Sequence, residues 1–139
     1  MDEKEFEVKI VKNWPEDGIV NLYKAGGWWR ENYSKSGIKY LIEGSFAFAV
    51  VIEKKTGKAV GMGRLLSDGV SDAYIQDLVV LNEYRGRGIG KYLVNELVNY
   101  CKSKKIMWIG LIAEPNQDNF YEKLGFKKMK SYVPMKYEE

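Results

Sequence analysis

The chain has 139 residues, of which 45% are hydrophobic and 14% aromatic, so it can form one packed core and is unlike a disordered chain. The net charge is only +3 and basic residues are interleaved with acidic ones, which argues against a nucleic-acid-binding protein, although a polyanionic small molecule would suit this charge. The absence of histidine excludes His-dependent triads and His-ligated metals, and the single cysteine, Cys101, excludes an internal disulfide and a cysteine-based zinc site.

The N-terminal residues do not look like a targeting segment. Residues 1–5 are polar and mostly acidic, unlike a secretory signal, and no apolar run approaches the roughly 20 residues of a membrane span. We therefore expect a cytoplasmic protein with no membrane segment and no metal ion.

The first 45 residues predict one strand and two helices. Apolar and polar residues alternate over residues 6–11, which indicates a strand. Pro15 and the two acidic residues after it are typical of a helix start, and Gly26 and Gly27 should end that helix. A second short helix is expected around Ile38 and Ile42.

The next segments predict an antiparallel meander of three strands. They cover residues 46–53, 59–66 and 73–81, and turn-forming residues separate them. The third strand is almost continuously apolar, so we expect it to be central and covered on both faces.

The C-terminal half predicts two helices and two further strands. In residues 89–101 apolar side chains recur every four residues, which gives a helix with Cys101 in the core rather than in a catalytic role. A strand over 106–113, a short helix capped by Asn116 and ended by Gly125, and a final strand over 133–137 complete the order β-α-α-β-β-β-α-β-α-β. The fold class is therefore a mixed α/β sheet, mostly antiparallel, in a single domain over residues 1–139.

A glycine-rich segment lies between the third meander strand and the long helix. Gly86, Gly88 and Gly90 let the backbone approach a ligand closely, and the helix start adds partial positive charge, so phosphate should bind here. The nearby charges of Arg85, Arg87 and Lys91 favour the same ligand. A Walker A loop does not fit, because Tyr92 follows the lysine, and the Gly-x-Gly-x-Gly spacing is one residue short of a dinucleotide fingerprint.

This segment resembles the acetyl-CoA motif of the GNAT superfamily of N-acetyltransferases, Gln/Arg-x-x-Gly-x-Gly/Ala. Arg85, Gly88 and Gly90 match the motif in place, and residues 74–80 and 120–126 match its flanks. The resemblance is strongest over residues 59–126. Alternatively, the glycines could form an ordinary turn between a strand and a helix.

The resemblance implies a binding mode for acetyl-CoA as co-substrate. Strands 73–81 and 106–113 would splay, and the pantetheine arm would lie between them. A backbone N–H near Leu78 or Val80 would polarise the thioester, and the amine would attack directly without a covalent enzyme intermediate. The implied coenzyme residues are Leu78, Val79, Val80, Arg85, Gly86, Arg87, Gly88, Ile89, Gly90, Lys91, Asn116 and Phe120.

The candidate catalytic residues are Tyr121 and Asp77. The resemblance places Tyr121 near the coenzyme sulfur as an acid, although it could be a core residue. Asp77 interrupts an apolar strand, so it is either hydrogen-bonded or functional. Gln76 stands where many family members have an acid, which leaves Asp77, Glu114 or bulk solvent as the proton acceptor.

The acceptor side is less defined by the sequence. Trp28 and Trp29 could contact the substrate or could pack in the core. We expect acetyl transfer to a primary amine of a small molecule, with a protein N-terminus or lysine as the alternative acceptor and a non-catalytic acyl-CoA-binding module as the rival function. We expect no nucleic-acid or membrane partner, and a homodimer is possible.

Overall fold

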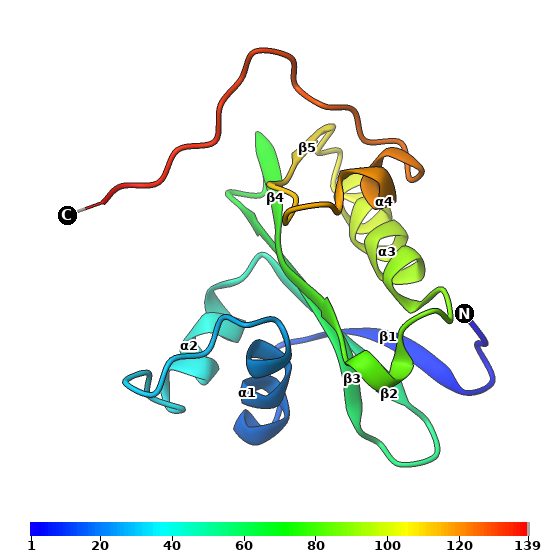
Figure 1. Cartoon of the computed structure of the whole chain (residues 1–139). Helices are drawn as coiled ribbons and strands as arrows, with labels where there is room; N and C mark the ends of the chain where they lie inside the picture. The colour runs from blue at the N-terminus through cyan, green and yellow to red at the C-terminus, as the bar shows by residue number, and fades with distance from the viewer. Residues whose placement is uncertain (139) are drawn as a thin grey trace.

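The computed structural model describes residues 1–138 and contains one five-stranded sheet (Figure 1). Its strands are β1 (Phe6–Val11), β2 (Ala47–Glu53), β3 (Ala59–Ser67), β4 (Asp72–Val80) and β5 (Trp108–Gly110), in that spatial order. The first four pair antiparallel, and β5 runs parallel to β4. The predicted fold class is confirmed.

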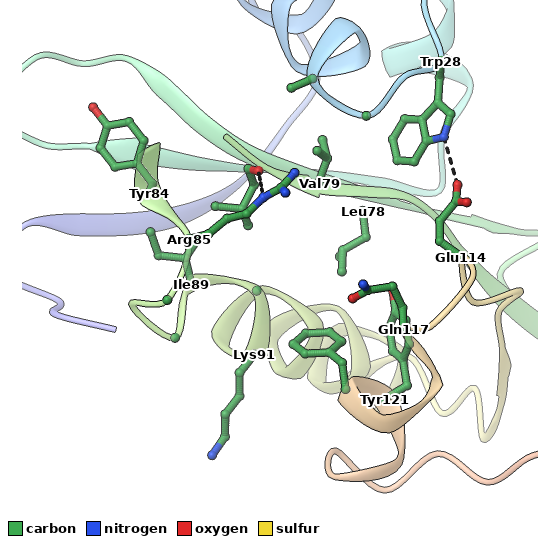
Figure 2. Close-up of a pocket in the computed structure, with 17 residues that line it drawn as sticks. Trp28, Leu78, Val79, Tyr84, Arg85, Ile89, Lys91, Glu114, Gln117 and Tyr121 are labelled. Carbon is green, nitrogen blue, oxygen red and sulfur yellow. Dashed lines mark hydrogen bonds between the residues drawn. The ribbon is translucent and has the colours of Figure 1, made fainter. Parts of the chain in front are cut away.

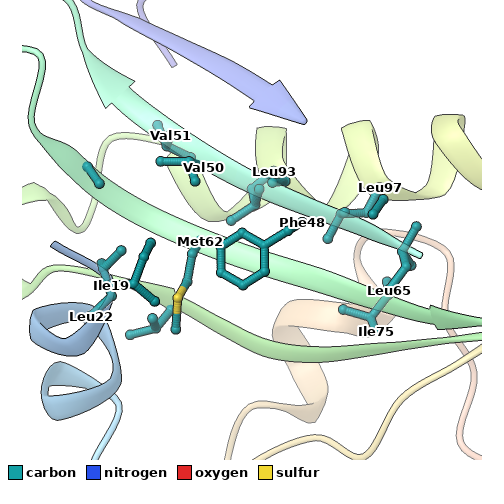
Figure 3. Packing of buried hydrophobic residues seen from close by; sticks show 14 of the residues in the cluster. Ile19, Leu22, Phe48, Val50, Val51, Met62, Leu65, Ile75, Leu93 and Leu97 are labelled. Atoms are coloured by element: carbon teal, nitrogen blue, oxygen red, sulfur yellow. The ribbon is translucent and has the colours of Figure 1, made fainter. Parts of the chain in front are cut away.

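Helices cover both faces of this sheet. The helices α1 (Glu16–Ala25) and α2 (Gly37–Gly44) lie on one side, and α3 (Ile89–Ser103) lies on the other, followed by α4 (Asp118–Glu122) (Figure 1). Figure 3 shows Ile19 and Leu22 of α1 packing from one side, and Leu93 and Leu97 of α3 packing from the other. Cys101 of α3 is buried in the same core, as its place on the apolar stripe predicts. No helix within residues 1–138 is long and apolar enough to cross a membrane.

The strand β2 is covered on both faces, since its residues are buried from Ala47 through Ile52. The expectation that residues 73–81 would be covered in this way is wrong for the first half of β4. There Ala73 and Ile75 are buried, whereas Tyr74 and Gln76 on the alternate face are exposed.

A bulge interrupts the pairing of β3 with β4. Met62 pairs with Val79, but Arg64, only two residues on, pairs with Gln76, so β4 contains one extra residue. Within the bulge Asp77 has a φ of 57°, a left-handed conformation that is uncommon for residues other than glycine. The bulge re-aims the backbone of the residues that follow it.

The strands β4 and β5 separate after a short contact. Only residues 72–74 of β4 pair with β5, and the strand expected over 106–113 is confined to Trp108–Gly110. Beyond this contact Leu78, Val79 and Val80 have no β5 partner, so one edge of β4 is open along these residues.

Two further expectations are corrected by the structure. Asn116 does not cap α4, which is preceded by Gln117; Asn116 instead adopts a left-handed turn conformation with a φ of 66°. Residues 133–137 form no strand, although apolar and polar residues alternate there. In the described chain no neighbouring strand pairs with them, and Val133 and Met135 are 74% and 90% exposed.

Candidate functional site

A cavity of about 560 Å³ opens where β4 and β5 separate. Its walls come from the end of α1, the end of β4, the glycine-rich loop, the start of α3, and the segment from Glu114 to Tyr121 (Figure 2). Among its lining residues are the following sequence-predicted coenzyme residues: Leu78, Val79, Val80, Arg85, Gly86, Gly88, Ile89, Gly90, Lys91 and Phe120. The structure therefore brings the motif and its C-terminal flank to one pocket.

The glycine-rich loop presents an uncapped helix start to this pocket. Gly86 and Gly88 have φ values of 80° and 77°, which glycine adopts without strain. Gly88 directly precedes α3, and no side chain caps the first-turn N–H groups of this 15-residue helix. Those donors and the helix dipole form an anion site next to the cavity.

The basic residues of the loop do not all face the pocket. Arg85 lines it and donates from Nε to the carbonyl oxygen of Val80 at 3.0 Å, which ties the loop to the end of β4. Lys91 also lines the pocket. Arg87, expected to contact the coenzyme, does not line it: its guanidinium lies 5.5 Å from the ring centre of Tyr84 and 3.7 Å from the carboxylate of Glu5.

Asn116, also an expected coenzyme residue, occupies the turn before α4 and lies outside the pocket lining. By contrast Gln117 and Tyr84 line the cavity although the sequence did not single them out. Tyr84 directly precedes the glycine-rich segment, and Gln117 lies three residues before Phe120. This closeness in sequence to the predicted motifs is the feature that could have suggested them.

Trp28 and Trp29 are adjacent in sequence but lie in different environments. Trp28 lines the pocket, and its Nε1–H donates to Oε1 of Glu114 at 3.0 Å (Figure 2). Its ring lies on Gly26, where a Cβ would stand only 2.5 Å from Trp28 Cε3, so glycine is required there. Trp29 instead packs edge-on against Tyr33 and does not line the pocket.

Tyr121 also lines the pocket, with its ring packed edge-on against Phe120 and Phe126. Burial raises the pKa of its phenol above the ordinary value, and the negative charge of Glu114 raises this pKa further. The hydroxyl therefore stays protonated at neutral pH and can donate a proton or a hydrogen bond into the cavity.

Asp77 is not among the pocket-lining residues. Its Oδ2 accepts hydrogen bonds from the Tyr23 hydroxyl and from Arg64 Nε, each at 2.7 Å. The expectation that Asp77 would be hydrogen-bonded is confirmed, and the structure does not bring it to the cavity as a base. Burial raises the pKa of Tyr23, and the bond to Asp77 raises it further.

The partners of Asp77 were missed by the sequence analysis. Arg64 is a charged residue within the apolar strand β3, which was a usable signal, because a mostly buried cation needs a counter-ion. Tyr23 lies on α1, 54 residues from Asp77 along the chain, and no sequence spacing connects the two.

Comparisons with known proteins agree with this geometry. The family model for the acetyltransferase (GNAT) family matches residues 13–126. The N-acetyltransferase ycf52 of Pyropia yezoensis is 33% identical over 117 residues, which cover 78% of this chain and 66% of that protein. GCN5-related N-acetyltransferase 2, chloroplastic, of Arabidopsis thaliana is 41% identical over 70 residues, covering 50% of this chain and 27% of that protein.

A solved structure gives the same result for the fold. The GNAT-family acetyltransferase from Streptococcus pneumoniae superposes with a TM-score of 0.80 at 25% identity, over 96% of this chain and 98% of that one. The chain spans 59–66% of the length of three ycf52 relatives, so it corresponds to part of those proteins. Since the family model matches most of the chain, this protein belongs to the acetyltransferase (GNAT) family.

Proposed function

We propose that this protein transfers an acetyl group from acetyl-CoA to a primary amine by direct attack. The observation that carries the proposal is the uncapped start of α3, preceded by left-handed Gly88, at one end of a cavity along the open edge of β4. Family membership supports acetyl transfer in general terms.

The coenzyme would bind along one wall of the cavity. Its pyrophosphate would accept hydrogen bonds from the N–H groups at the start of α3, with Arg85 and Lys91 supplying positive charge. Its pantetheine arm would lie along Leu78 to Val80, where β4 has no β5 partner.

The chemistry would be a direct displacement. The amine nitrogen attacks the thioester carbonyl carbon, a backbone N–H of the β4 edge holds the oxyanion, and the carbon–sulfur bond then breaks. Tyr121 would donate a proton to the leaving thiolate. We propose Glu114, rather than Asp77, as the acceptor of the amine proton, because Glu114 lines the cavity and is exposed to water, whereas Asp77 Oδ2 is held by Tyr23 and Arg64.

A matched pair of glycine variants tests the coenzyme placement. Gly88 and Gly57 both have positive φ, but Gly57 lies in the β2–β3 hairpin and is not among the pocket-lining residues. We expect Gly88→Glu to lose acetyl-CoA binding in titration calorimetry, and Gly57→Glu to keep it, with similar backbone strain in both. Equal affinity in the two folded variants would refute the placement.

Release of the CoA thiol separates the possible functions. Turnover with small primary amines supports the proposal, and turnover only with peptides would assign the acceptor to a protein N-terminus or lysine. Binding of acetyl-CoA without turnover of either class would instead indicate a non-catalytic acyl-CoA-binding module.

A further inference from the structure

The cavity has opposite charges at its two ends. Of the described residues that line it, Arg85, Lys91 and Glu114 are the charged ones. Figure 2 shows Arg85 beside the glycine-rich loop and Glu114 on the opposite side, with Leu78 and Val79 between them. The basic end suits the polyanionic coenzyme, so the acidic end is left for the other substrate.

The acidic end combines a carboxylate with aromatic rings. Glu114 Oε1 accepts the hydrogen bond from Trp28 Nε1, and within residues 1–138 no Lys or Arg nitrogen lies within 4.0 Å of this carboxylate. Oε2 is thus available to a ligand. The Trp28 ring and the Tyr121 phenol line the same cavity, and aromatic rings beside a carboxylate are a favourable environment for an ammonium group.

We propose that this end of the cavity selects an acceptor amine that is cationic and bears no acidic group next to its amine. The inference rests on the proposed acetyl transfer and names the acceptor class. Glu114 binds the ammonium form of the acceptor through Oε2, while Trp28 fixes the orientation of the carboxylate through Oε1. A carboxylate on the carbon that carries the amine would be placed close to Glu114, and like charges at that distance repel.

Two pairs of amines test this selection directly. Tyramine differs from tyrosine, and 2-phenylethylamine from phenylalanine, only by the carboxylate beside the single amine. We expect kcat/KM to be at least about tenfold higher for the acid-free member of each pair, which corresponds to about 1.4 kcal/mol.

Glu114→Gln separates recognition from proton transfer. Glutamine keeps an oxygen for Trp28 Nε1 but removes the negative charge. Loss of the proton acceptor lowers kcat/KM for both members of a pair, so the ratio within each pair reports recognition alone. We expect this ratio to fall below about threefold in the variant, because the repulsion is gone. Asp17→Asn, a change in an exposed carboxylate outside the pocket lining, should leave the ratio at its wild-type value.

Binding measurements provide a readout without chemistry. Titration of the same four amines into the protein saturated with CoA should give the same order of affinity and the same dependence on Glu114. Ratios near one in the wild type, or ratios unchanged in Glu114→Gln, would overturn the inference while leaving acetyl transfer intact. If none of the four amines releases thiol from acetyl-CoA or binds the CoA complex, transfer to small amines fails and the inference fails with it.

Discussion

Replacing Asp77 should destabilise the protein by an amount that depends on the substituting residue. Its Oδ2 accepts bonds from Arg64 and Tyr23 at 2.7 Å, and the side chains of Arg64 and Asp77 are only 16% and 22% exposed. Breaking a fully buried ion pair costs about 3–5 kcal/mol, so this partly solvated pair should cost about 2–3 kcal/mol. A left-handed conformation adds about 1 kcal/mol when the new residue is alanine.

Three substitutions separate these two contributions. Asp77→Ala loses the carboxylate and strains the backbone, so the free energy of unfolding should fall by about 3–4 kcal/mol. Asp77→Gly loses only the carboxylate, so its free energy of unfolding should fall by about 2–3 kcal/mol. Asp77→Asn tolerates the left-handed conformation and keeps an oxygen for Arg64 or Tyr23, so it should lose about 1–2 kcal/mol.

Urea denaturation followed by tryptophan fluorescence measures these values, and calorimetry with acetyl-CoA shows whether the bulge still positions the edge of β4. We expect Asp77→Asn to retain acetyl-CoA affinity within about threefold and to keep the acidic limb of the pH–rate profile, because Asp77 lies outside the pocket lining and we propose Glu114 as the base. Equal stability of the wild type and the glycine variant would refute the structural role of the carboxylate. A shift of the acidic limb in Asp77→Asn would instead assign the role of general base to Asp77.

Further variants test the other side chains of the site. Tyr121→Phe should lower kcat by about tenfold to a hundredfold with acetyl-CoA affinity nearly intact, and unchanged kcat at every pH would show that Tyr121 only packs. Trp28→Ala should raise the acceptor KM, whereas the matched Trp29→Ala should lower Tm with little effect on KM; the opposite pattern would exchange their roles. The pKa of Tyr23 is raised in the folded protein. Its hydrogen bond to Asp77 therefore stabilises the folded protein fully below about pH 10, the ordinary pKa of tyrosine, and this stabilisation is lost as the pH rises above that value. Denaturation at pH 9 and pH 11 should therefore show a larger loss of stability in the wild type than in Tyr23→Phe, and parallel losses would contradict this linkage.

The parts of the site that the sequence predicted are those set by local chemistry. The left-handed glycines and the start of α3 depend on neighbouring residues, so Gly88 and Ile89 could be assigned to a ligand-binding loop from their order alone. The network around Asp77 could not be assigned, because Tyr23 and Arg64 reach it only after α1 packs on the sheet.

The same difference between local chemistry and long-range packing explains which secondary-structure predictions were wrong. Residues 133–137 have the alternation of a strand, but a strand also needs a partner edge, which no local pattern supplies. Asn116 is a good capping residue by type, yet it is equally suited to a left-handed turn, and the turn is what the chain adopts before α4.

The short contact between β4 and β5 has a consequence for the way the protein opens. The meander β1–β4 is held by long ladders, whereas β5 joins it through residues 72–74 only. Amide hydrogens of Trp108–Gly110 should therefore exchange with solvent through local opening, well before those of β2 and β3, which require global unfolding. A ligand bound between β4 and the segment from Glu114 to Tyr121 would restrain the chain that follows β5, so exchange in Trp108–Gly110 should slow more than exchange in β2 and β3 when the cavity is occupied.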